Sequence, residues 1–112
     1  MESLSIGQVV LAAFPFSDLT SAKLRPCFVI GVAEFDDIVL CQLTSNRYGS
    51  KRAVILRKTA DFDDGSILHD SYVRPDKIAT LDRRMIKQVL GAVTASKLLE
   101  VKLSLKEFLE IS

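Results

Sequence analysis

Short apolar segments separated by turn-forming residues are the feature that most constrains the fold of this chain. Clear segments bounded by Gly, Pro, Asp or Ser occupy residues 9–14, 27–33, 38–43 and 53–56, and weaker ones occupy residues 72–74, 78–81 and 86–93. Apolar runs of this length between such breaks predict strands. Pro75-Asp76 and Asp82-Arg83-Arg84 are expected to separate the weaker strands. Up to seven short strands predict a mainly β fold, either a barrel or a strongly bent sheet.

The last part of the chain changes to a helical period. Thr94 can cap the start of a helix. The apolar stripe that follows consists of Leu98, Val101, Leu105, Phe108 and Leu109, and charged residues lie elsewhere around the wheel at Lys97, Lys102, Lys106 and Glu110. We therefore expect a C-terminal amphipathic helix that packs on the sheet. Leu103 and Ile111 fall outside the stripe and can also contact a partner.

The length of the chain predicts one domain. A sequence of 112 residues builds a modest core and leaves no room for a second, so we expect a single domain over residues 1–112. No apolar run approaches the roughly 18 residues of a membrane span. The start, Met1-Glu2-Ser3, lacks the basic region of a signal peptide. These features predict a cytoplasmic protein that does not cross a membrane.

Soft metal ligands are few. Cys27 and Cys41 lie within apolar segments, where reduced and buried thiols are expected. His69 is the sole histidine, and it is not closely spaced from either cysteine. We therefore predict no metal site and no disulfide.

A polar loop between the first two predicted strands ends at Arg25. Pro26 follows directly, and it favours an extended backbone at the arginine. The guanidinium is thus presented by a restrained segment just before a buried strand. If residues 27–33 and 38–43 form a hairpin around an acidic turn, the register places Arg25 opposite Thr44. Directly opposed residues have Cα atoms about 4.5–5.5 Å apart, so both side chains can reach one phosphate.

A guanidinium and a hydroxyl on one phosphate suit attack of an RNA 2′-hydroxyl on the adjacent phosphorus. Arg25 would neutralise the charge that develops on the nonbridging oxygens, and Thr44 would donate a further hydrogen bond. Arginine stays protonated to about pH 12 and is a poor general base. Lys23 and His69 are other candidates for proton transfer, although a mobile loop cation and an exposed histidine are the simpler interpretations. Asp18 either orients Arg25 or caps a turn.

A basic loop follows Thr44. The net charge of the chain is only +1, yet residues 44–58 carry five cations and no acidic residue. Cations and an aromatic ring suit single-stranded nucleic acid, and a solvated loop is the alternative. Ser45 and Asn46 can bond base edges or be ordinary loop residues. The predicted RNA-binding residues are Asp18, Lys23, Ser45, Asn46, Arg47, Tyr48, Lys51 and Arg52.

Four parts of the sequence resemble the PemK/MazF family of toxin endoribonucleases. They are residues 7–10, residues 14–30 with the Lys23-Leu24-Arg25-Pro26 turn, residues 44–46 with the Thr44-Ser45 pair, and residues 71–78. The resemblance implies an SH3-like barrel with a C-terminal α-helix. It also implies that Arg25 and Thr44 are the catalytic pair, which would cut single-stranded RNA without a metal or other cofactor to leave a 2′,3′-cyclic phosphate and a 5′-hydroxyl.

Partners follow from the same resemblance. It implies a homodimer, with RNA across a groove at the subunit interface, and a cognate antitoxin that neutralises the toxin. Two alternatives remain open. A gyrase-inhibiting toxin of the CcdB type shares this fold, but its tail carries a tryptophan and this chain has none. A noncatalytic barrel that binds RNA or a peptide is the other.

Overall fold

The computed structural model describes residues 3–13, 23–46 and 50–111. Within these residues the chain forms seven strands, a 3₁₀ turn and one α-helix. In chain order they are β1 (Gln8–Ala12), β2 (Arg25–Val32), β3 (Asp37–Thr44), β4 (Val54–Leu56), β5 (Phe62–Gly65), β6 (Ser71–Asp82), η1 (Arg83–Met85), β7 (Ile86–Val93) and α1 (Ala95–Leu109). The mainly β fold with a C-terminal helix is therefore confirmed.

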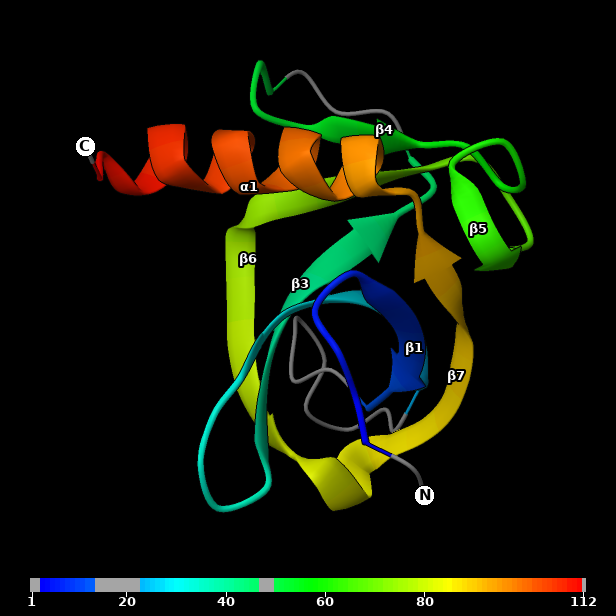
Figure 1. The fold of residues 1–112 in the computed structure, drawn as a ribbon, viewed down its shortest axis with the longest axis vertical. Helices are drawn as coiled ribbons and strands as arrows, with labels where there is room; N and C mark the ends of the chain where they lie inside the picture. The colour runs from blue at the N-terminus through cyan, green and yellow to red at the C-terminus, as the bar shows by residue number, and fades with distance from the viewer. Residues whose placement is uncertain (1–2, 14–22, 47–49, 112) are drawn as a thin grey trace.

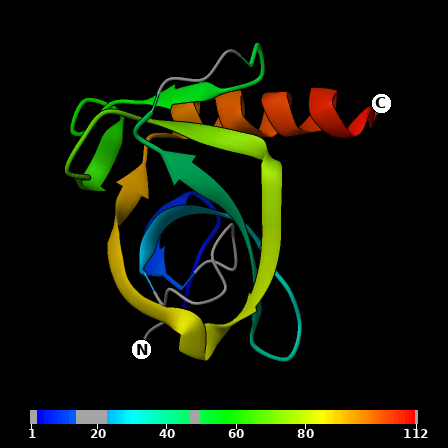
Figure 2. The same ribbon diagram turned by 180° about the vertical axis from the view of Figure 1, so that it is seen from behind.

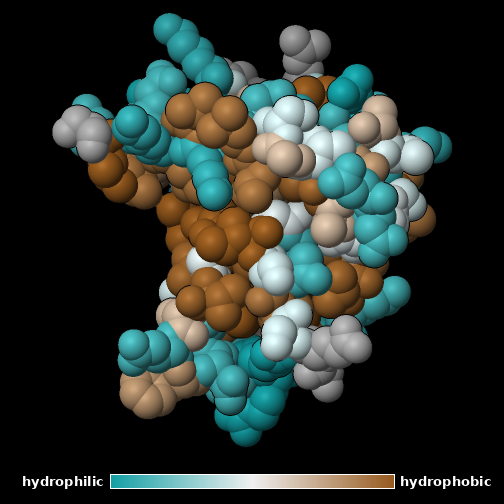
Figure 3. Space-filling model, viewed as in Figure 1, coloured by the Kyte–Doolittle hydropathy of each residue, from teal (hydrophilic) through white to brown (hydrophobic). Residues whose placement is uncertain are grey.

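The strands form one antiparallel sheet in the order β4-β6-β3-β2-β1-β7-β5. The sheet curls, so that β6 and β7 lie on opposite sides of the central strands, and α1 lies across one end beside β4 (Figure 1). The view from behind shows the same curl (Figure 2). Hydrophobic side chains gather below α1 in the middle of the first face, and hydrophilic ones lie around its upper and lower edges (Figure 3).

Both faces of the central strands are covered. In β2, Cys27 and Val29 belong to one apolar cluster, whereas Phe28 belongs to a second, because successive side chains of a strand point to opposite faces. Val101 of α1 is 1% exposed and belongs to the second cluster. The helix therefore closes one side of the curled sheet.

The helix begins as predicted but buries a different set of residues. The Thr94 side chain accepts a hydrogen bond from the Lys97 backbone N–H, which confirms the cap. Lys97 is 5% exposed, although it falls outside the predicted apolar stripe. Phe108 and Leu109 of the predicted stripe are 38% and 49% exposed, because the sheet does not extend beneath the end of the helix. No helix among residues 3–13, 23–46 and 50–111 is long and apolar enough to cross a membrane.

Strand β6 is continuous where two strands were predicted. Cys41 pairs with Ile78 and Leu43 with Val73, so β6 has extra residues across a short stretch of β3. Pro75 lies within this bulge. The bulged residues are not paired with β3, so the missing N–H of the proline costs the sheet no hydrogen bond. The proline therefore bends the strand without ending it.

Strand β5 was not among the predicted strands. Phe62 pairs with Val93 and Gly65 with Gly91. A Cβ atom on Gly65 would lie 2.0 Å from the Leu90 carbonyl oxygen, and Gly65 has φ +73°. Gly65 and Gly91 have no Cβ atom, so the backbones of β5 and β7 can approach closely there. The acidic residues around Gly65 did not suggest a strand.

Candidate active site

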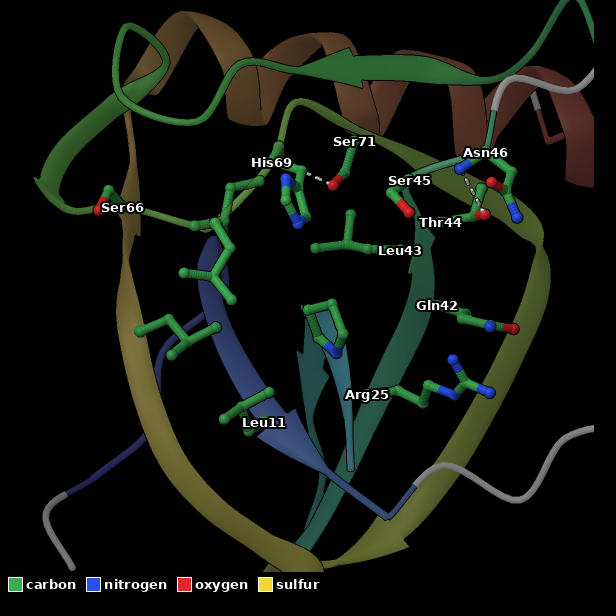
Figure 4. Close-up of a pocket in the computed structure, with 14 residues that line it drawn as sticks. Leu11, Arg25, Gln42, Leu43, Thr44, Ser45, Asn46, Ser66, His69 and Ser71 are labelled. Atoms are coloured by element: carbon green, nitrogen blue, oxygen red, sulfur yellow. Dashed lines mark hydrogen bonds between the residues drawn. The ribbon is translucent and has the colours of Figure 1, made fainter. Parts of the chain in front are cut away.

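The open ends of β2 and β3 bring Arg25 and Thr44 to one cavity. Cys27 pairs with Gln42 and Phe28 with Cys41, so the predicted hairpin register is confirmed. Arg25 begins β2, Thr44 ends β3, and both line a cavity of about 370 Å³ (Figure 4). Ligand pockets typically measure about 300–1,000 Å³. The cavity is therefore of a size to hold a small ligand such as one nucleotide.

Arg25 is held in place by its backbone. The strand pairs it with Ala12, and its carbonyl accepts a hydrogen bond of 3.4 Å from the Cys27 Sγ. None of the described residues bonds to the exposed guanidinium. Cys27 and Cys41 are free and buried as predicted, and burial, with Cys41 nearby, raises the pKa of Cys27 to about 12. A neutral thiol therefore lies below the arginine, whose charge remains available to an anion.

The Thr44 hydroxyl is oriented by the turn that follows it. Its Oγ1 accepts a 3.1 Å hydrogen bond from the Asn46 backbone N–H. A hydroxyl that accepts with a lone pair can still donate its proton, so Thr44 is set to donate toward a bound oxygen. Ser45 and Asn46 also line the cavity. The predicted group of Arg25, Thr44, Ser45 and Asn46 is thus brought together.

The segment between β5 and β6 forms the facing wall, which the sequence reasoning missed apart from His69. Ser66, Ile67, Leu68, His69 and Ser71 line the cavity from this side. The Ile67 N–H donates to the Lys58 carbonyl at 3.0 Å, and the Lys58 N–H donates to the Asp70 carboxylate at 2.8 Å. The Ser71 hydroxyl donates to the His69 carbonyl at 2.8 Å. These bonds tie the wall to the turn after β4, and they also join it to the start of β6.

Gln42 is a second lining residue that the sequence reasoning missed. It lies on β3 between Arg25 and Thr44 in Figure 4, opposite the β6 bulge. Its Oε1 is buried and has no hydrogen-bond partner among the described residues. A buried acceptor without a partner is costly, and an N–H group of a ligand would satisfy it. The sequence could have indicated Gln42, because it is the polar residue within an otherwise apolar run.

A buried ion cluster supports the facing wall. Asp61 is 3% exposed, and its carboxylate accepts hydrogen bonds from the Arg57 backbone N–H, Nε and Nη2 at 2.8, 3.1 and 2.6 Å. Lys97 Nζ lies 3.5 Å from the same carboxylate and donates to the Ile55 carbonyl at 2.9 Å. Chiefly through the Arg57 hydrogen bond, the pKa of Asp61 falls to about 2. The cluster ties α1 to the segment that carries Lys58.

Three of the other predicted RNA-binding residues, Lys23, Lys51 and Arg52, do not line this cavity. Lys23 is exposed just before β2. Lys51 and Arg52 line a second hollow between β4 and α1, with Tyr72 and Glu100. Arg52 Nε is buried there and has no hydrogen-bond partner in the described part of the chain, while the Arg52 carbonyl accepts from the Ser104 hydroxyl at 2.5 Å. Three further predicted residues, Asp18, Arg47 and Tyr48, lie outside the described residues.

Metal ligands do not cluster in the described structure. Across residues 3–13, 23–46 and 50–111 there is no group of three or more His, Cys, Asp or Glu side chains placed to hold a metal ion. The side chains that line the cavity offer a positive charge and hydrogen-bonding groups. It presents one guanidinium, several hydroxyl and amide groups, and one imidazole.

Solved structures with the same fold cover nearly the whole chain. An endoribonuclease from a mycobacterial species is 24% identical with a TM-score of 0.73, over 98% of this chain and 94% of the other. A mycobacterial endoribonuclease in complex with its cognate antitoxin is 23% identical with a TM-score of 0.77, over 98% of each chain. The MazE-MazF structure (Form-II) from Deinococcus radiodurans is 23% identical with a TM-score of 0.75, over 100% of each.

A search of curated proteins found no match. The model of the PemK-like, MazF-like toxins of type II toxin-antitoxin systems matches residues 5–109. This match contains both β2 and β3 and the cavity between their ends and the facing wall. The chain belongs to the family of PemK-like, MazF-like toxins of type II toxin-antitoxin systems.

Proposed function

We propose that this toxin is a metal-independent endoribonuclease that cleaves single-stranded RNA, including messenger RNA, and so inhibits translation and growth. The observation that carries the proposal is the shared cavity of Arg25 and Thr44. Similar folds include proteins named endoribonucleases. We further propose that residues 1–112 act as one toxin domain in the cytoplasm.

The two side chains suit a transition state in which negative charge builds on phosphorus-bound oxygens. As the 2′-oxygen bonds to phosphorus and the bond to the 5′-oxygen breaks, the guanidinium of Arg25 can neutralise that charge with two parallel hydrogen bonds. Thr44, whose oxygen is already held by Asn46, donates a third. Such fixed donors lower the barrier because they need no rearrangement during the reaction. The products are a 2′,3′-cyclic phosphate and a 5′-hydroxyl.

RNA is the substrate that this cavity suits best. Its space accommodates about one nucleotide, and Gln42, Ser45 and Asn46 offer hydrogen bonds to base edges. The chain continues from Asn46 to Lys51 and Arg52 in the second hollow. We propose that flanking nucleotides reach these cations, with Asp18, Lys23, Arg47 and Tyr48 as further contacts.

A cognate antitoxin is the expected regulator. Relatives of similar fold are in complex with antitoxins, and the family consists of toxins of type II toxin-antitoxin systems. We propose that an antitoxin occludes the cavity or the second hollow. Addition of the protein encoded beside this toxin should then stop cleavage at an equimolar ratio.

The test is product analysis on a defined single-stranded RNA. The protein should yield fragments with a 5′-hydroxyl, which polynucleotide kinase labels directly, and a 2′,3′-cyclic phosphate. Arg84→Ala is the matched control for Arg25→Ala, because the Arg84 side chain is 89% exposed and lies away from the cavity. Arg84→Ala should cut and Arg25→Ala should not. Binding without cleavage would favour the noncatalytic alternative, and inhibition of gyrase supercoiling without RNA cleavage would favour the CcdB-type alternative.

A further inference from the structure

We propose that His69 is the general base that takes the proton from the attacking 2′-hydroxyl. This inference rests on the proposed ribonuclease function. Neither Arg25 nor Thr44 can accept that proton near neutral pH, because arginine stays protonated to about pH 12 and the threonine hydroxyl is a poor base. The reaction therefore needs a further group within the same cavity.

Among the described residues that line the cavity, only Arg25 and His69 carry a side chain that titrates. The other lining side chains are apolar, hydroxyl or amide groups. Histidine is the side chain whose proton exchange normally falls between about pH 5 and 8, which suits a general base at neutral pH. Elimination within the described lining therefore selects His69.

His69 lines the same cavity as the catalytic pair, from a different segment of the chain. Figure 4 shows its ring pointing into the cavity, with Arg25 and Thr44 on the far side. The backbone around it is fixed, because Ile67 is 8% exposed in the core and the Ser71 hydroxyl bonds to the His69 carbonyl. A nucleotide that fills this space touches both walls, so its phosphate can meet Arg25 while its ribose meets the imidazole.

The charges around His69 come from few elements. Arg25 of β2 lines the same cavity, Asp70 is the neighbour of His69 in the chain, and Lys58 with Arg57 lies on the segment to which Asp70 is bonded. The described lining from β1, β3 and β7 carries no charged side chain.

In the proposed step, proton transfers accompany the bond changes at phosphorus. The neutral imidazole takes the 2′-hydroxyl proton while the 2′-oxygen forms its bond to phosphorus. The bond from phosphorus to the 5′-oxygen breaks, and the 5′-oxygen takes a proton from solvent water at the cavity mouth. The imidazolium then returns its proton to solvent. Atoms and charge are conserved, and no other co-reactant is required.

Single-turnover cleavage by His69→Gln and His69→Ala provides the first test. Loss of a general base should slow the step by about 100-fold or more. The wild-type rate should fall toward acid pH, because a protonated imidazole cannot accept a proton, and His69→Gln should lack that dependence. Free imidazole should restore part of the His69→Ala rate. A slow variant with the wild-type pH profile and no rescue would show a structural role and overturn the proposal.

A substrate with a sulfur in place of the scissile 5′-oxygen separates a base from an acid. Thiolate leaves without protonation, so a defect in the general acid disappears on this substrate, whereas a defect in the base persists. We expect His69→Gln to stay slow. Recovery to the wild-type rate would make His69 the acid and contradict the assignment.

Two comparisons isolate this inference from the proposed function. In Asp18→Asn the cleavage rate should still fall toward acid pH, as in the wild type. If the rate of Asp18→Asn no longer falls toward acid pH, whereas that of His69→Gln still does, the general base is Asp18. If His69→Gln cuts at the wild-type rate while Arg25→Ala does not cut, His69 is not the base and the ribonuclease function stands. If the wild-type protein does not cut RNA, both proposals fall.

Discussion

Asp61→Asn should destabilise the protein in a way that depends on pH. The carboxylate is buried, and its pKa falls from the ordinary 3.8 to about 2, first through the Arg57 hydrogen bond. One pKa unit is worth about 1.4 kcal/mol, so the ionised carboxylate stabilises the fold by about 2.5 kcal/mol at pH 7. Because the folded-state pKa is lowered, this contribution is full above the unfolded value and is lost as the pH falls through about 2. It should be about 1.3 kcal/mol at pH 3 and about 0.4 kcal/mol at pH 2.

Urea unfolding of the wild-type protein and Asp61→Asn at pH 7, 4, 3 and 2 measures this difference directly. Asparagine has the shape of the protonated acid, so the two proteins should converge in stability toward pH 2. Asp63→Asn is the matched control, since Asp63 is an exposed neighbour, and it should change the unfolding free energy by less than about 0.5 kcal/mol. A difference between wild type and Asp61→Asn that stays constant from pH 7 to pH 2 would refute the electrostatic account.

Three further predictions concern the substrate and the assembly. Cleavage should persist in excess EDTA, because Arg25 meets the phosphate charge; loss on chelation with recovery in magnesium would contradict the mechanism. The double variant Lys51→Ala, Arg52→Ala should bind RNA more weakly. The slope of log affinity against log salt should fall by about 0.7 for each phosphate that the protein no longer neutralises. An unchanged slope would mean that this loop is solvated and does not contact RNA. Sedimentation at micromolar concentration should give about twice the 12.4 kDa monomer; a monomer would remove the interface groove, to which exposed Leu103 and Ile111 could contribute.

The hairpin and the helix start could be predicted because short-range patterns determine them. Residues 27–33 and 38–43 are apolar runs that pair across a short turn, and beyond an irregularity between Val29 and Gly31 their register brings Arg25 toward Thr44. Thr94 caps the helix through a hydrogen bond three residues along the chain. In both cases the deciding contacts lie close in sequence or follow directly from the strand period.

The features that the sequence did not predict depend on long-range contacts. Lys97 resembles a solvated helix cation, yet Asp61 and the Ile55 carbonyl hold it in a buried place. The wall that carries His69 is fixed by backbone bonds to Lys58, and strand β5 depends on the close approach of Gly65 to β7. Local propensity contains no information on these partners.

The Arg25 and Thr44 pair is the central claim, and a double-mutant cycle tests it most directly. Single-turnover cleavage of one RNA would be measured for wild type, Arg25→Ala, Thr44→Ala and the double variant, with circular dichroism to confirm folding. Arg25→Ala should cost on the order of 3 kcal/mol, at least about 100-fold in rate, and Thr44→Ala should cost less. Because both act on one developing charge, the double variant should be little slower than Arg25→Ala. A folded Arg25→Ala protein that cuts at the wild-type rate would contradict the active site, and fully additive losses would contradict the shared phosphate.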